Sequence, residues 1–154
     1  MSVFKTTFSR ALNIAASENA NIPYPNLIVS AINSTDGTTT LTDATAAFIT
    51  NNIKTGDIVI DTDGLRVTVT EVVSETELEL NSVVGAICKI YQASSQTGLG
   101  NQGCYIYNSE NEINISVLTI GGDIVTFFKV PSATILPVQV LNVLQGDGVF
   151  TALW

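Results

Sequence analysis

Residues 57–73, DIVIDTDGLRVTVTEVV, carry the pattern that most constrains the fold of this chain. Apolar residues recur at every second position on both sides of an Asp-Gly pair, as in Ile58 and Ile60 before it and Val67 and Val69 after it. Such alternation is typical of a strand with one buried face, and Asp-Gly is a strong signal for a tight hairpin turn. The stretch therefore predicts two antiparallel strands.

Other short strands are predicted around this hairpin. They are LIVSAIN at 27–33, TTTLTD at 38–43, TELEL at 76–80 and VVGAICKIY at 83–91. Between the strand at 38–43 and the hairpin, we predict one short turn, with Asp43 as its cap and Phe48 as its apolar anchor. Together these segments predict a compact module over residues 27–91, which we expect to be a small β-barrel.

A polar, glycine-rich connection at 92–103 separates this module from a second run of strands. The later strands are predicted in CYIYN, EINISVLTI, IVTFFKV, VQVLNVLQ and VFTALW, with a GGD hairpin turn at 121–123. No long helix and no fixed-period repeat is apparent. The sequence thus predicts an all-β fold with little helix: a β-sandwich or jelly-roll-like portion at 92–154 that packs with the N-terminal segment and carries the inserted barrel.

The first 26 residues differ from the rest because they contain few large apolar residues. Thr7 or Ser9 could cap a short helix running through Leu12 and Ala16. The proline-containing stretch NIPYPN at 21–26 would end it in an extended conformation. We therefore predict an N-terminal arm or short helix.

The chain ends in VFTALW, with a tryptophan as its last residue. Chain ends are usually polar and frayed, so we predict a final strand, joined to VLNVLQ by a hairpin turn at 145–148. Trp154 then either covers the end of the core or contacts a neighbouring subunit, since tryptophan is favoured in both settings. The sequence leaves both alternatives open.

The charge of the chain restricts its partners. Its net charge is −8 and it has six lysines and arginines in total, so it lacks the cationic stripe that nucleic-acid binding needs. An acidic surface also disfavours anionic membranes. The first 20 residues lack the apolar region of a signal peptide, and no run reaches the roughly 20 apolar residues of a membrane span. We expect no nucleic-acid or membrane partner, and synthesis in a cytoplasm.

Several classes of catalytic site are disfavoured. The chain has no histidine, which removes His-based triads and most zinc sites. Cys88 and Cys104 have apolar or glycine neighbours and predict two buried thiols, with a disulfide as the alternative if their Cα atoms lie within about 7 Å. We predict no enzymatic activity and no cofactor.

Three motifs have both a functional and a plain structural interpretation. GLGNQG at 98–103 matches the dinucleotide fingerprint, but that motif works only between a strand and a helix, and both flanks are wrong here. DTDG at 61–64 could hold a divalent cation, yet a hairpin turn explains it. Glu75, Glu77 and Glu79 share one strand face, which suits either acid–base chemistry on sugars or protection of a sheet edge.

Two stretches resemble structural proteins of tailed phages. Residues 40–80 resemble a module found in such proteins, whose anchors here are Leu41, Asp43, Phe48, Gly56, Asp57, Asp63 and Gly64. Residues 130–154 are similar to the C-terminus of head spike base proteins of phages and gene transfer agents, through Leu136, Pro137, Val138, Val140, Ala152, Leu153 and Trp154. The usual Thr-rich turn before the last strand is QGDG here. The opening residues resemble small virion proteins of marine and cyanobacterial phages.

The resemblance implies a virion structural protein, made in the host cytoplasm and attached to the capsid as a decoration (cement) protein or as the base of a head spike or fibre. We expect a non-enzymatic, self-associating subunit, a trimer or pentamer, whose partners are the major capsid protein or other virion proteins. The expected interface residues are Phe4, Phe8, Tyr24, Tyr105, Tyr107, Pro137, Phe150 and Trp154. The alternatives are a tail, baseplate or neck component, and a carbohydrate-binding module that uses Tyr105 and Tyr107.

Overall fold

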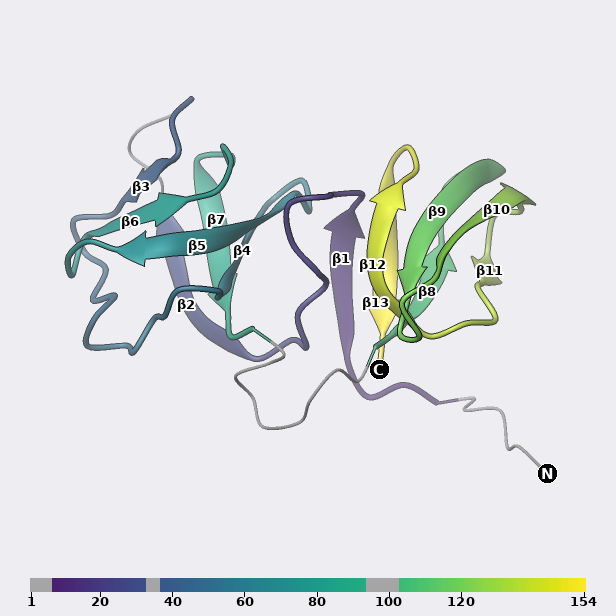
Figure 1. Ribbon diagram of the computed structural model, residues 1–154, viewed down its shortest axis with the longest axis horizontal. Coiled ribbons are helices and arrows are strands. Elements are labelled where there is room, and N and C mark those ends of the chain that lie inside the picture. Colours follow the sequence, from purple (N-terminus) through teal and green to yellow (C-terminus); the bar gives the residue numbers. More distant parts are fainter. Residues whose placement is uncertain (1–6, 33–36, 94–102) are drawn as a thin grey trace.

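The computed structural model describes residues 7–32, 37–93 and 103–154 (Figure 1). The described chain is all-β, as the alternating patterns predict, and its 13 strands form three antiparallel sheets. A four-stranded sheet has the order β1 (Ala11–Ala15), β13 (Val149–Leu153), β8 (Tyr105–Asn108) and β11 (Thr134–Ile135). A three-stranded sheet has the order β10 (Ile124–Val130), β9 (Ile113–Thr119) and β12 (Val140–Gln145).

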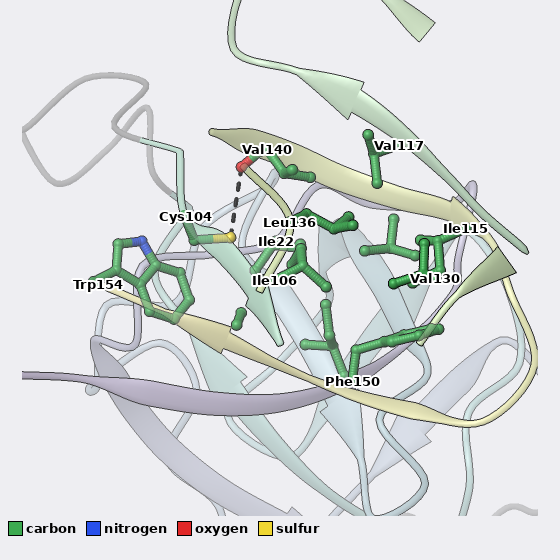
Figure 2. Close-up of a cluster of buried hydrophobic side chains, with 13 residues drawn as sticks. Ile22, Cys104, Ile106, Ile115, Val117, Val130, Leu136, Val140, Phe150 and Trp154 are labelled. Atoms are coloured by element: carbon green, nitrogen blue, oxygen red, sulfur yellow. Dashed lines mark hydrogen bonds between the residues drawn. The ribbon is translucent and has the colours of Figure 1, made fainter. Parts of the chain in front are cut away.

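The four- and three-stranded sheets form a sandwich around one hydrophobic core. Inward-facing residues of both sheets meet there, including Ile106 and Phe150 from one sheet and Ile115 and Val117 from the other (Figure 2). These four side chains have no exposed surface. Burial of large apolar side chains is the main source of stability for such a sandwich.

The inserted module is a single six-stranded sheet with its own core. Its order is β2 (Leu27–Ile32), β7 (Ile87–Tyr91), β4 (Ile58–Asp61), β5 (Arg66–Val72), β6 (Glu77–Leu80) and β3 (Thr40–Thr42). The edge strands β2 and β3 do not pair with each other in the described part of the chain, so the sheet is strongly curved but is not the closed barrel that we expected (Figure 1).

Two local predictions for the module are confirmed. The Asp-Gly pair at 63–64 joins β4 and β5, with Ile58 opposite Thr68. Asp43 accepts a hydrogen bond from the backbone N–H of Thr45 at 2.8 Å, and Phe48 is fully buried. The turn is therefore capped and anchored as its residue types predict.

The N-terminal segment differs from the predicted arm or short helix, because residues 11–15 form strand β1. This strand pairs with β13, so that Ala11 lies opposite Leu153 and Ile14 opposite Phe150. Ile14 points into the core and Leu12 packs against it. A two-residue apolar period fits the edge of a sheet better than the face of a helix, and the available partner strand decides between them.

The predicted hairpin between VLNVLQ and VFTALW is wrong, because β12 and β13 belong to different sheets. The chain crosses from one layer of the sandwich to the other through residues 146–148. Gly146 and Gly148 have φ angles of 150° and 99°, which side-chain-bearing residues rarely adopt. A Cβ atom on Gly146 would lie 2.8 Å from the Phe150 ring. The crossing therefore depends on glycine.

Trp154 is a core residue of the single chain, which decides between the two alternatives for it. Its side chain is 9% exposed and belongs to the sandwich core (Figure 2). Its backbone N–H donates to the Arg10 carbonyl at 3.0 Å, and its carbonyl accepts the Ser9 N–H at 2.7 Å. The last residue thus continues the pairing of β13 with the N-terminal segment.

The inserted module contacts the sandwich through the tip of its β4–β5 hairpin. The Gly64 carbonyl accepts a hydrogen bond from the Ala15 N–H at 2.9 Å. Behind this contact, Ala20, Ile58, Ile60 and Tyr91 form a small buried cluster, and β1 lies between the module and the rest of the sandwich (Figure 1).

Candidate functional site

Three of the expected interface residues lie together on the outer side of the four-stranded sheet. Tyr105 and Tyr107 point outward because the intervening Ile106 points into the core. The ring of Phe8 packs on that of Tyr105, with 5.8 Å between the ring centres and a 59° tilt. Both tyrosines are half-buried, so each presents part of its ring to the surroundings.

The outward residues of the neighbouring strands extend this surface. Leu153 lies opposite Tyr105, and both Thr151 and Ile135 lie opposite Tyr107. We call the outward set Phe8, Tyr105, Tyr107, Thr151, Leu153 and Ile135 the tyrosine face. It is apolar and aromatic with hydroxyl groups, and it holds no charged side chain. Tyrosine suits interfaces because it combines a large apolar ring with a polar tip.

Tyr24 lies with Trp154 and belongs to a second aromatic group. The two ring centres are 5.8 Å apart in an edge-to-face arrangement. The Arg10 guanidinium lies 5.8 Å from the centre of the Tyr24 ring and donates to the Pro25 carbonyl at 3.1 Å. These contacts fix the end of the core.

The remaining expected residues do not form part of one surface. Phe150 has no exposed surface, so it is a core residue and cannot contact a partner. Trp154 is likewise a core residue. Pro137 is exposed in the segment between β11 and β12. Phe4 lies outside the described residues.

A groove between the sandwich and the inserted module was not expected from the sequence. It has a volume of about 550 Å³, within the usual range of ligand sites. One wall is β1, with Ala11, Leu12 and Asn13, and the other is formed by β4 and β7. Lys89 and Tyr91 give it polar groups, and burial raises the pKa of the Tyr91 hydroxyl, which therefore stays protonated.

The carboxylate of Asp61 in this groove is already used by the hairpin. One oxygen accepts the N–H groups of Asp63 and Leu65, both at 3.0 Å, and the other accepts the Gly85 N–H at 3.1 Å. No group of three or more potential ligands that could hold a metal ion occurs in the described ranges. The DTDG motif therefore acts as a turn.

The three glutamates do not share one strand face as predicted, because Glu77 and Glu79 lie on β6 whereas Glu75 lies in the turn before it. Two of them have structural roles. Glu75 accepts hydrogen bonds from the backbone N–H groups of Ile49 and Thr50 at 3.0 and 3.1 Å and from the Thr50 hydroxyl at 2.7 Å. The pKa of Glu75 is lowered mainly by the hydrogen bonds that its carboxylate accepts from Thr50. Glu79 accepts the Thr40 hydroxyl at 2.7 Å. A lowered pKa is the opposite of what a general acid needs.

The two cysteines are buried thiols in different cores. Cys88 belongs to the core of the six-stranded sheet and Cys104 to that of the sandwich. Cys104 lies 3.5 Å from the Val140 carbonyl (Figure 2). Burial raises the pKa of each thiol to about 12, so neither is a ready nucleophile. No disulfide joins them.

Most of the GLGNQG motif, residues 98–102, lies outside the described residues. Its last residue, Gly103, has a φ of 60° and leads within two residues into strand β8. A strand follows where a phosphate-binding motif requires the N-terminus of a helix.

Comparisons with protein-family models, with curated proteins and with solved structures found no match for this chain. Among the described residues, no helix is long and apolar enough to cross a membrane.

Proposed function

We propose that this protein is a non-enzymatic structural subunit of a phage virion. In this role it attaches to the capsid, as a decoration (cement) protein or as the base of a head spike or fibre, and associates with further copies of itself. Its partners are the major capsid protein or other virion proteins, and the virion is where it acts.

The tyrosine face is the observation that carries this proposal. It presents Tyr105 and Tyr107 beside apolar neighbours on one sheet, and its residues belong to none of the core clusters formed by the described part of the chain. None of the six residues of this face is charged, so a partner can cover it at a small desolvation cost. Tyrosine-rich faces are typical of protein interfaces.

Attachment to a lattice does not need high affinity at each face. A capsid repeats the same site many times, and linked copies of a weak binder gain avidity from simultaneous contacts. The trimer or pentamer implied by the resemblance would place several tyrosine faces toward one capsid vertex or facet.

The proposal is tested by co-sedimentation with shells assembled from the major capsid protein encoded in the same genome. We expect the full chain to pellet with shells, and the double variant Y105A/Y107A to lose at least about tenfold in apparent affinity. Ile49→Ala is the matched control, because Ile49 is a 56% exposed apolar residue on the inserted module. Equal pelleting of all three proteins, or none with the wild type, would contradict attachment through this face.

A carbohydrate-binding module is the second candidate, because the two tyrosines offer adjacent rings on one face and the nearby groove holds polar groups. A glycan panel separates the two functions. The carbohydrate-binding function would be favoured if the wild type binds a polysaccharide, the variant Y105A/Y107A does not, and neither protein pellets with shells. A tail, baseplate or neck location would instead appear as pelleting with those virion parts and not with the shell.

A further inference from the structure

Strand β10 is an edge strand whose outward side chains are unusually apolar. Among residues 7–32, 37–93 and 103–154 it pairs with β9 on one side and has no strand on the other. It lies at the end of the molecule opposite the inserted module (Figure 1). Ile124 is 70% exposed and Phe128 is 75% exposed, the two highest values among the large hydrophobic residues described as exposed. Exposed apolar edges favour pairing with another strand.

The pattern of hydrogen bonds defines which backbone groups face the open edge. The Thr119 N–H donates to the Asp123 carbonyl at 2.8 Å at the start of the β9–β10 pair. Because bonded positions alternate in an antiparallel pair, Val125 and Phe127 bond toward β9. The N–H and C=O groups of Ile124, Thr126 and Phe128 then point to the open edge.

The residues of this edge are complementary to themselves when the strand is reversed. If two β10 strands lie antiparallel with Thr126 opposite Thr126, then Ile124 lies opposite Phe128, and Asp123 opposite Lys129. This register matches the three outward-bonding positions with one another. It also pairs the apolar residues together and places opposite charges at both ends.

We propose that β10 pairs with β10 of a second copy of this chain across a two-fold axis. The two three-stranded sheets then form one continuous six-stranded sheet. We infer that the partner is a second copy because β10 is complementary to itself, including the charges of Asp123 and Lys129. A contact across a two-fold axis requires such self-complementarity. This pairing uses a different surface from the tyrosine face and does not rest on the proposed virion role.

Features that normally protect an edge occur only at the far end of this strand. The pairing with β9 is irregular between Phe127 and Val130, Lys129 has a φ of 52°, and Pro131 follows. Bulges and proline discourage pairing, and here they end the pairing at Lys129. A contact of one strand on each side is small, so association should be weak in solution.

Charge reversal tests the pairing. In analytical ultracentrifugation of the full chain at about 5–500 µM, a range suited to micromolar dissociation constants, we expect a dimer that dissociates on dilution. D123K and K129D should each weaken it about tenfold, because the two-fold axis repeats the altered contact. The combined variant D123K/K129D should return to within about threefold of the wild type. Aspartate tolerates the positive φ at position 129.

A cysteine at the predicted axis tests the register independently. With Thr126→Cys, mild oxidation by diamide, which takes up two electrons and two protons from the two thiols, should yield a covalent dimer. The Cα atoms of a bonded antiparallel pair lie about 5.5 Å apart, within disulfide range. Thr62→Cys, at an exposed turn of the inserted module, is the matched control and should stay monomeric.

Three results would overturn the proposal. They are a wild type that stays monomeric over the whole range, a double variant as weak as the single variants, and cross-linking of Thr62→Cys as fast as that of Thr126→Cys. A trimer or pentamer unaffected by the charge reversals would place self-association on another surface.

Discussion

The guanidinium of Arg66 donates a hydrogen bond to the side-chain oxygen of Asn142, 76 residues away in the sequence. Arg66 has no exposed surface, and it also donates to the backbone carbonyls of Ala15, Ala20 and Val143. Asn142 in turn donates to the Ser17 carbonyl at 2.8 Å. The inserted module is therefore joined to both layers of the sandwich through one buried cation.

Removal of Asn142 should destabilise the whole chain. Burial lowers the pKa of Arg66 to about 10, so the group is still charged at neutral pH and needs its acceptors. Asn142→Leu should lower the free energy of unfolding by about 2–4 kcal/mol, because it leaves a buried donor and the Ser17 carbonyl unpaired. Urea unfolding measures this.

The double variant R66M/N142L separates pairing from packing. The double variant should lose less free energy of unfolding than the sum of the losses in the two single variants. The reason is that the second substitution removes a group that the first left unpaired. Strict additivity would show that the two side chains do not depend on each other.

Gly64 should tolerate no side chain. Its φ is 83°, and a Cβ atom there would lie 2.6 Å from the Ala15 nitrogen. Gly64→Ala should lower the free energy of unfolding by about 3 kcal/mol, from the positive φ and from overpacking against β1. Gly122→Ala is the matched control, because its φ is 91° and nothing lies within 4 Å of its Cβ position. Equal melting temperatures for the two variants would contradict the close contact.

Trp154 should contribute to the stability of the isolated chain. Trp154→Ala should cost about 3–5 kcal/mol, because it empties a buried site at the end of the sandwich core. Val149→Ala, on the exposed side of β13, the strand that Trp154 follows, should cost less than about 1 kcal/mol. A melting curve unchanged by Trp154→Ala would show that the residue is not part of the core.

The two thiols should make stability fall at alkaline pH. Burial raises their pKa values to about 12, above the ordinary thiol pKa of 9.0. Between pH 9 and 10 the unfolded chain releases protons that the folded chain retains, so the free energy of unfolding decreases, by about 1–2 kcal/mol for the pair. This stabilisation is fully present below about pH 8.

Urea titrations at pH 8, 9 and 10 measure this effect. The variant C88A/C104A should show a flatter pH dependence over the same interval. Deprotonation of Arg66 in the folded chain begins only near its pKa of about 10. Because the unfolded chain keeps this proton to higher pH, the free energy of unfolding then rises with pH, opposite to the effect of the thiols. If the wild type and the variant have the same pH dependence, the thiols are not the cause.

Local features of the fold could be predicted from the sequence because they depend on neighbouring residues. The Asp-Gly turn at 63–64, the GGD turn at 121–123 and the Asp43 cap are each specified by a few adjacent side chains. The alternation of Ile113, Ile115 and Val117 likewise indicates a strand with one apolar face.

The partner of each strand could not be predicted in the same way. An alternating strand shows that one face is buried, but it does not say against which segment. That is why the sequence predicts a hairpin of β12 and β13, which instead lie in opposite layers. It is also why the sequence predicts an arm or helix where residues 11–15 form a strand.

The sequence by itself determined the all-β class, the positions of the main turns and the apolar character of the cores, because strand period and turn chemistry act over a few residues. Only the tertiary structure decided that Trp154 closes the core, that Arg66 joins the module to the sandwich, that the tyrosine face lies on the outer side of its sheet, and that β10 is the last described strand of its sheet. Each of these depends on contacts between segments far apart in the chain, whose pairing is chosen by the packing of the whole molecule.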